Sequence, residues 1–223
     1  MKKVILITGG SRGIGKYLVD SLSPDYLIST CSRKIAESET DDLLSMKCDL
    51  RKHNDVVRFT DATIRKFGRI DVMIYNAGLI LYDDMLDVKE DVIDELYGVT
   101  VKGYLFICQE VIPVMRKQRS GHIISISSIR GLSAVPGKSA YSAMKRAAIS
   151  MTDSVRVENR QYGIKATSLH PAAVDTDSSH ERYKGKLDHV NFVQERDILK
   201  TIIFLLSLSE HTVVDSIFVD GAL

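Results

Sequence analysis

The chain has no tryptophan, only four prolines and only three cysteines among its 223 residues. The cysteines are Cys31, Cys48 and Cys108, and their spacing matches neither a metal-binding nor a redox motif. This usage is typical of a reducing compartment, so we expect a cytoplasmic protein. The six histidines also lack metal-ligand spacing, and we predict no catalytic metal.

Long apolar runs and an excess of one charge are missing as well. No stretch approaches the roughly 20 apolar residues that a membrane helix needs, so we expect no membrane partner. The 30 basic residues are interspersed with 29 acidic ones, which argues against nucleic acid as a partner. The remaining composition, 44% hydrophobic and 26% charged residues, is ordinary for a soluble globular protein.

Short apolar runs alternate with longer amphipathic ones along the chain. The apolar runs predict strands at 2–8, 26–31, 44–48, 70–76, 122–127, 164–170 and 216–220. The amphipathic stretches predict helices at 14–22, 53–67, 89–117 (expected to be broken), 139–161 and 195–208. This alternation indicates an α/β fold, a doubly wound parallel sheet of seven strands with helices on both faces. No linker rich in Pro, Gly or Ser interrupts it, so residues 1–223 are predicted to form a single domain.

The stretch TGGSRGIGKY, residues 8–17, follows the first predicted strand and can be interpreted as a phosphate-binding loop in two ways. The loop of a nucleoside triphosphatase needs Ser or Thr after the lysine, to bind magnesium, and Tyr17 stands there instead. Asp220 favours this interpretation, because it ends an apolar strand as a magnesium-holding aspartate would. A dinucleotide-binding turn needs glycines before a helix, whose free N–H groups face the phosphates, and they stand at 9, 13 and 15.

More distant residues favour the dinucleotide. In YSAMK, Tyr141 and Lys145 are four residues apart in a predicted helix and therefore share one face. Ser128 ends a predicted strand thirteen residues before the tyrosine, and NAG (76–78) ends another. Ligands of α/β sheets bind at the carboxyl ends of the strands. We therefore expect these residues and the glycine turn to line one site.

Seven motifs, in order, resemble the short-chain dehydrogenase/reductase family over nearly the whole chain. They are TGGSRGIG, CDL, NAG, the serine of SISS, YSAMK, HPAAVDT and FVDG. The resemblance implies a Rossmann fold and hydride transfer between a nicotinamide cofactor and a carbonyl or secondary alcohol. A 3-oxoacyl reductase is the nearest type by family frequency. The family commonly forms tetramers, so a homo-oligomer, a homotetramer or a dimer, is expected.

The resemblance also implies which residues bind the cofactor. The glycine turn would lie under the pyrophosphate, Asp49 would hydrogen-bond the adenine, and the segment after the sixth strand would border the nicotinamide. The implied residues are Gly9, Ser11, Arg12, Gly13, Ile14, Gly15, Asp49, Leu50, Asn76, Ala77, Gly78, Tyr141, Lys145, Pro171, Val174 and Thr176.

The implied catalytic residues are Ser128, Tyr141 and Lys145. Hydride transfer leaves negative charge on the carbonyl oxygen, which must then receive a proton. Tyr141 would donate that proton, and Ser128 would hydrogen-bond the oxygen and position it. A free tyrosine has a pKa of about 10, and the Lys145 cation would bring it towards neutrality by favouring the phenolate. Lys145 would also hold the ribose hydroxyls.

The second predicted strand is followed by SRK, without the acidic residue that binds the ribose 2′-hydroxyl in NAD-using folds of this kind. Arg33 stands there, and Arg12 of the glycine turn is placed to form the other side of a 2′-phosphate site. A guanidinium suits phosphate by its charge and by paired hydrogen bonds. NADP(H) is therefore predicted rather than NAD(H).

Three features depart from the family pattern. Thr100 stands where the family has an asparagine that helps to hold a water of the proton relay, and Ala172 stands where glycine is usual. The substrate lobe, roughly 177–194, is short and polar, which suits an anionic substrate or a solvated loop. Two functions follow: an NADPH-dependent carbonyl reductase for a small or medium metabolite, or an NADP(H)-binding sensor or scaffold with catalysis impaired by Thr100.

Overall fold

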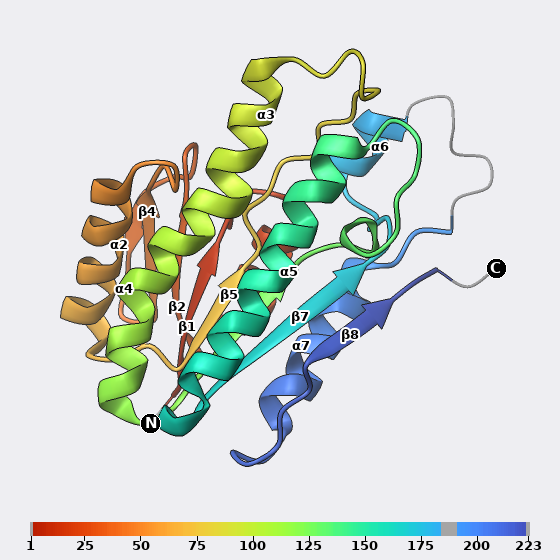
Figure 1. Cartoon of the computed structure of the whole chain (residues 1–223). Helices are drawn as coiled ribbons and strands as arrows, with labels where there is room; N and C mark the ends of the chain where they lie inside the picture. Colours follow the sequence, from red (N-terminus) through yellow and green to blue (C-terminus); the bar gives the residue numbers. More distant parts are fainter. Residues whose placement is uncertain (1, 184–190, 222–223) are drawn as a thin grey trace.

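The structure is a computed structural model that describes residues 2–183 and 191–221. Its centre is a sheet of eight strands in the order β3-β4-β2-β1-β5-β6-β7-β8 (Figure 1). Every neighbouring pair is parallel except β3 and β4. The strands are β1 (Val4–Thr8), β2 (Leu27–Ser32), β3 (Ser38–Glu39), β4 (Leu43–Lys47), β5 (Val72–Tyr75), β6 (Gly121–Ile126), β7 (Ile164–Pro171) and β8 (Ser216–Val219).

Helices cover both faces of the sheet. α2, α4 and α5 lie on one face, and α1 and α7 lie on the other (Figure 1). Within the part of the chain that the structure describes, no helix has the length and apolarity needed to cross a membrane. The helices are α1 (Gly13–Leu22), α2 (His53–Phe67), α3 (Glu90–Tyr97), α4 (Gly103–Gln118), α5 (Ser139–Asn159), α6 (Asp177–Tyr183) and α7 (Glu195–Ser207).

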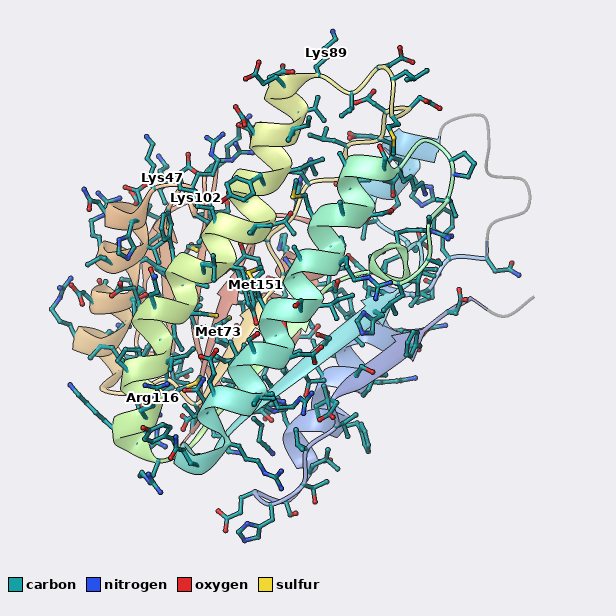
Figure 2. The ribbon with its side chains drawn as sticks, viewed as in Figure 1. Lys47, Met73, Lys89, Lys102, Arg116 and Met151 are labelled. Carbon is teal, nitrogen blue, oxygen red and sulfur yellow. The ribbon has the colours of Figure 1, made fainter. Side chains whose placement is uncertain are left out.

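β1 illustrates how the sheet is buried on both faces. All five of its residues are buried, and they alternate between two cores. Leu6 packs beneath α2, α4 and α5 in the core that also holds Met73 of β5, with Met151 of α5 at its border (Figure 2). Ile5 and Ile7 pack beneath α1 and α7. Each fully buried Leu or Ile contributes roughly 1.5–3 kcal/mol, which is why this layered fold requires continuous apolar strands.

The predicted fold class is confirmed, and all seven predicted strands are present with ends within two residues of those expected. The predicted number of strands is wrong by one. The additional strand, β3, consists of two exposed residues that pair antiparallel with β4. Two exposed polar residues form no apolar run, so this strand leaves no pattern in the sequence.

The order of the strands reverses at β1, which lies between β2 and β5. Chain connections leave β1 towards one edge of the sheet and later return to build the other edge. In doubly wound sheets the ligand crevice opens at such a reversal, beyond the carboxyl ends of the strands. The glycine turn follows β1 at this point.

The helix predicted to be broken within 89–117 is continuous, so that prediction is wrong. α3 passes through five residues of π-helix, η1 (Gly98–Lys102), directly into α4. Pro113 lies inside α4 and does not end it. Single π-turns within α-helices occur frequently at functional sites, and this one contains Thr100.

Close packing explains the two glycines in this helix. A Cβ on Gly103 would lie 2.9 Å from the Tyr75 hydroxyl, and one on Gly98 would lie 3.1 Å from the Arg51 side chain. Tyr75 also donates a hydrogen bond to the Val99 carbonyl within the π-turn. Both glycines have right-handed helical backbone angles. They allow the helix to approach its neighbours and do not terminate it.

Candidate active site

A cavity of about 1110 Å³ lies along the carboxyl ends of the parallel strands. It is slightly larger than the roughly 300–1,000 Å³ that is typical of small-molecule sites. All predicted cofactor-binding residues except Gly15 line it, and so do all predicted catalytic residues except Thr100. The predicted residues on its wall are Gly9, Ser11, Arg12, Gly13, Ile14, Arg33, Asp49, Leu50, Asn76, Ala77, Gly78, Ser128, Tyr141, Lys145, Pro171, Val174 and Thr176.

The glycine turn joins β1 to α1 and is fixed to the neighbouring strand. The N–H groups of Gly9 and Gly10 donate to the Cys31 carbonyl of β2, at 2.7 and 3.3 Å. Gly9 and Gly13 have positive φ angles of 78° and 52°, which only glycine adopts readily. α1 begins at Gly13 with no acidic residue in its first turn, and the exposed Arg12 precedes it. The turn therefore presents positive charge and free N–H groups to the cavity.

Asn76 connects the end of β5 to the glycine turn. Its side-chain amide donates to the carbonyls of Thr8 and Gly9, at 3.0 and 3.3 Å. A Cβ on Gly15 would lie 2.2 Å from the Gly9 oxygen and 2.4 Å from the Asn76 amide nitrogen. Gly15 therefore allows α1 to pack against the turn from behind, which explains why it does not line the cavity. Asn76 both supports the turn and lines the cavity.

The geometry disfavours the nucleoside triphosphatase interpretation. Lys16, which would have to reach the phosphates, is exposed and pairs with Asp20 one turn along α1, at 2.6 Å. Asp220 follows β8, which β5, β6 and β7 separate from β1. An aspartate at the end of β8 is therefore not adjacent to β1, the strand that precedes the glycine turn. Among the residues that the structure describes, no group of three or more His, Cys, Asp or Glu side chains could hold a metal ion.

Tyr141 and Lys145 share one face of α5, and each is only 7% exposed. Nζ of Lys145 lies 5.8 Å from the centre of the Tyr141 ring and donates to the Ile126 carbonyl at 3.2 Å. A Cβ on Gly78 would lie 3.5 Å from this nitrogen, so the NAG segment packs against the lysine. Burial lowers the pKa of Lys145 from 10.5 to about 8. The cavity wall thus contains a buried amine beside a buried phenol.

Ser128 follows β6 and caps a short 3₁₀ helix, η2 (Ile129–Gly131). Its Oγ accepts a hydrogen bond from the Arg130 N–H at 3.1 Å. A serine hydroxyl can accept and donate at the same time. Capping therefore leaves the hydroxyl proton available for a substrate oxygen, and both roles are compatible at this position.

Tyr82 and Lys138 also line the cavity, and sequence reasoning did not identify them. The Tyr82 ring meets the Tyr141 ring edge to face, with centroids 5.3 Å apart and planes at 83°. Nζ of Lys138 lies 4.1 Å from the centre of the Tyr82 ring, which is cation–π geometry. Tyr82 is far from Tyr141 in sequence and belongs to no motif, so only the fold reveals this contact.

The segment after β7 forms a part of the cavity wall that adjoins the glycine turn. Pro171 ends β7, and Val174 is 5% exposed. The Thr176 hydroxyl accepts a hydrogen bond from the Ser179 N–H at 3.3 Å at the start of α6. Its methyl group would lie 3.6 Å from a Cβ on Gly13. The expected nicotinamide segment and the expected pyrophosphate turn are therefore neighbours in the cavity wall.

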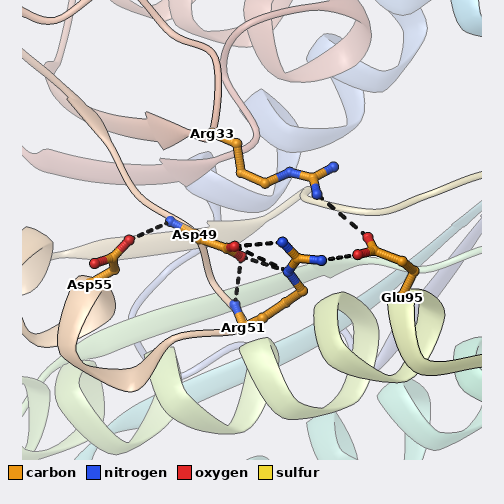
Figure 3. Close-up of polar contacts among 5 residues, drawn as sticks. All are labelled: Arg33, Asp49, Arg51, Asp55 and Glu95. Carbon is orange, nitrogen blue, oxygen red and sulfur yellow. Dashed lines mark hydrogen bonds and ion pairs between the residues drawn. The ribbon is translucent and has the colours of Figure 1, made fainter. Parts of the chain in front are cut away.

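Arg33 and Asp49 line the cavity and also belong to a row of ion pairs (Figure 3). Asp49 accepts hydrogen bonds from the backbone and guanidinium of Arg51, the shortest at 2.6 Å. Arg51 also contacts Glu95 of α3, whose other oxygen lies 3.4 Å from Arg33. We call Asp49, Arg51, Glu95 and Arg33 the charge row. The hydrogen bonds from Arg51, more than the nearby charge of Arg33, hold the pKa of Asp49 below its usual range.

Thr100 lies outside the cavity wall, and only part of the substrate lobe belongs to that wall. Thr100 is 3% exposed and does not line the cavity. In the lobe, His180 of α6 pairs with Asp175 at 2.5 Å. Residues 184–190, which include Lys184 and Lys186, lie outside the described residues. The lobe contributes Ser178, Ser179, Glu181 and Asn191 to the cavity wall.

The chain is similar to known proteins in both sequence and structure. The family model described as short chain dehydrogenase matches residues 3–187. An uncharacterized oxidoreductase of Staphylococcus saprophyticus is 33% identical over 97% of this chain and 95% of its own length. The solved structure of ElxO with NADP bound has a TM-score of 0.87 and 27% identity, over 98% of each chain. A tyrosine-to-phenylalanine variant of ElxO with NADPH bound gives the same values.

Proposed function

The chain belongs to the short-chain dehydrogenase family of oxidoreductases, and from this premise we propose that it is an NADP(H)-dependent carbonyl reductase. It transfers a hydride between the nicotinamide and a carbonyl or secondary alcohol of a small or medium metabolite. One observation carries the proposal: Ser128, Tyr141 and Lys145 line the same cavity as the glycine turn. The NADP and NADPH bound to the two ElxO structures are in accord with it.

The residues of the cavity fit a dinucleotide. The positive φ angles of the turn and the N-terminus of α1 suit a pyrophosphate. Lys145 is within reach of a ribose placed against Gly78. Arg33 and Arg12 supply the guanidinium groups for a 2′-phosphate. Pro171, Val174 and Thr176 form the remaining wall, where the nicotinamide would lie.

The bound cofactor supplies the hydride. The residues of this chain bind the substrate oxygen and transfer its proton. Ser128 donates a hydrogen bond to the oxygen and fixes its position. Tyr141 donates its phenolic proton as negative charge develops on the oxygen, and it accepts that proton in the oxidation direction. Lys145 is the cation beside the phenol, and a nearby cation stabilises the phenolate that remains after transfer.

Titration with the two reduced cofactors tests the cofactor choice. NADPH is expected to bind at least about tenfold more tightly than NADH, because a hydrogen-bonded charge pair contributes about 1.5–3 kcal/mol. Arg33→Gln is expected to remove most of this difference, and Arg58→Gln, an exposed arginine of α2 outside the cavity, should leave it unchanged. Nicotinamide fluorescence reports both affinities without a substrate. NADH binding that is equal or tighter refutes the cofactor choice. If the protein binds neither cofactor, the proposed enzymatic function is refuted.

The alternative function, an NADP(H)-binding sensor or scaffold with impaired catalysis, depends on Thr100. For an active reductase, Thr100→Asn is expected to change kcat by less than about threefold, because threonine still supplies its backbone carbonyl and a hydroxyl. Turnover and NADPH affinity are measured together on both proteins. A gain in kcat of more than about tenfold at unchanged affinity would favour the sensor or scaffold function instead. Thermal melting verifies that the buried substitution leaves the fold intact.

A further inference from the structure

Arg33 lines the cavity and is joined to the charge row through Glu95 (Figure 3). Arg33 and Asp49 line the cavity, whereas Arg51 and Glu95 are not part of its wall. Glu95 therefore contacts Arg33 from the side of α3, away from the space where a cofactor would lie. Any ligand phosphate that binds Arg33 competes with the Glu95 carboxylate for the same guanidinium.

The two arginines of the charge row are held very differently. Arg51 contacts Asp49 through its Nε, its terminal nitrogen and its backbone N–H, and its side-chain stem packs against Gly98. Arg33 makes a single contact with Glu95, at 3.4 Å, and its side chain is 46% exposed. Exposed single-contact ion pairs are weak. Arg33 is therefore the member that a ligand can draw away, while Arg51 stays with Asp49.

The charges of the row cancel, because two arginines face two carboxylates. A 2′-phosphate carries close to two negative charges at neutral pH, and it would approach an arginine that Glu95 already neutralises. After Arg33 turns to the phosphate, the Glu95 carboxylate remains nearby and repels it. A 2′-hydroxyl has no charge, so a dinucleotide without the phosphate is not subject to this repulsion.

We infer that Glu95 is a specificity-determining residue, which acts through Arg33 to weaken the preference for a dinucleotide bearing a 2′-phosphate. The inference rests on the proposed function, because it assumes that NADP(H) binds in this cavity. The site is thus tuned by a residue of α3, which is distant in sequence from both β2 and the glycine turn. Glu95 limits the affinity for NADPH and leaves the affinity for NADH unaffected.

Glu95→Gln is the variant that isolates the charge. Glutamine keeps an oxygen that can accept hydrogen bonds from Arg33 and Arg51, but it carries no negative charge. NADPH is expected to bind the variant about three- to tenfold more tightly than the wild type, from Coulomb attraction at a partly exposed site. The affinity for NADH is expected to change by less than about twofold. Asp94→Asn removes the same charge from the neighbouring exposed position of α3 and should leave both affinities unchanged.

Two further measurements show whether the effect runs through Arg33. In an Arg33→Gln background, Glu95→Gln should no longer tighten NADPH binding, because the guanidinium for which the two anions compete is absent. Raising the salt concentration to about 0.5 M should remove most of the gain, since salt screens charges at exposed sites. A purely structural role for Glu95 would change neither the salt dependence nor the ratio of the two affinities.

Each outcome of the titrations has a definite meaning. Weaker NADPH binding by Glu95→Gln would mean that the carboxylate orients Arg33 for the phosphate, and it would overturn the inference. Equal changes for NADPH and NADH would indicate a structural role and would also overturn it. Weaker NADH binding alone would make Glu95 an acceptor for the 2′-hydroxyl, and the inference would again be wrong. If the wild type binds neither cofactor, the proposed function itself fails. If the wild type binds NADPH but Glu95→Gln does not bind it more tightly, only the inference about Glu95 fails.

Discussion

Tyr141→Phe is expected to lower kcat for carbonyl reduction by about 10²- to 10⁴-fold, the usual contribution of a positioned general acid. Phenylalanine keeps the ring that packs against Tyr82 and removes only the hydroxyl that would donate the proton. NADPH affinity is expected to change by less than about twofold, since the loss concerns an interaction made in the transition state. Turnover with a panel of small ketones, together with NADPH titration, measures both quantities.

Tyr162→Phe is the matched control for this substitution. Tyr162 lies under the guanidinium of Arg116, outside the cavity wall, so the loss of its hydroxyl should leave kcat unchanged. If Tyr141→Phe retained kcat within about tenfold of the wild type, another group would have to donate the proton. The first candidate would then be Tyr82, whose ring contacts that of Tyr141.

Lys145→Met is expected to lower turnover by at least about a hundredfold and yet to stabilise the folded protein near neutral pH. Burial lowers the pKa of Lys145 from 10.5 to about 8, and unfolding restores the ordinary value. At about 1.4 kcal/mol per pKa unit, keeping this lysine charged in the folded protein costs about 3 kcal/mol. Methionine has a similar length and no charge, so the variant avoids this cost.

The stability difference between wild type and Lys145→Met has a definite pH dependence. Between pH 8 and 10.5 the unfolded chain binds more protons than the folded one, so the wild type gains stability as pH rises through this window. The advantage of the methionine variant is therefore largest near pH 7 and shrinks towards pH 10. Urea unfolding at both pH values measures it. The same curves for Lys89→Met, at an exposed position (Figure 2), should show no such trend. A methionine variant that is less stable than the wild type near pH 7 would contradict the expectation.

Some parts of the site depend only on backbone conformation or on one helix face, and local sequence patterns were enough to predict their geometry. The glycine turn needs positive φ angles at Gly9 and Gly13, and only glycine supplies them readily. Tyr141 and Lys145 meet because residues four apart share a helix face. Both patterns are contained in a few consecutive residues, so they can be read without the fold.

Contacts between distant segments could not be read in this way. Glu95 is 44 residues from Arg51 and 62 from Arg33, and no spacing rule relates such positions. The contact of Tyr82 with Tyr141 depends on how the segment after β5 crosses the cavity. The helix expected to break remains continuous, since both of its glycines have helical backbone angles, and their close contacts with Tyr75 and Arg51 could not be read from a helical pattern.

The continuous helix formed by α3, η1 and α4 also limits how the protein can be engineered for heat resistance. Replacing glycine by alanine inside a helix commonly adds about 0.5–1 kcal/mol of stability. At Gly103 the new methyl group would meet the Tyr75 hydroxyl and Leu50, and at Gly98 it would meet the stem of Arg51. These two glycines, which a propensity scale would mark for replacement, are therefore positions where alanine has little room. A thermostable version of this enzyme has to be sought on the exposed faces of its helices.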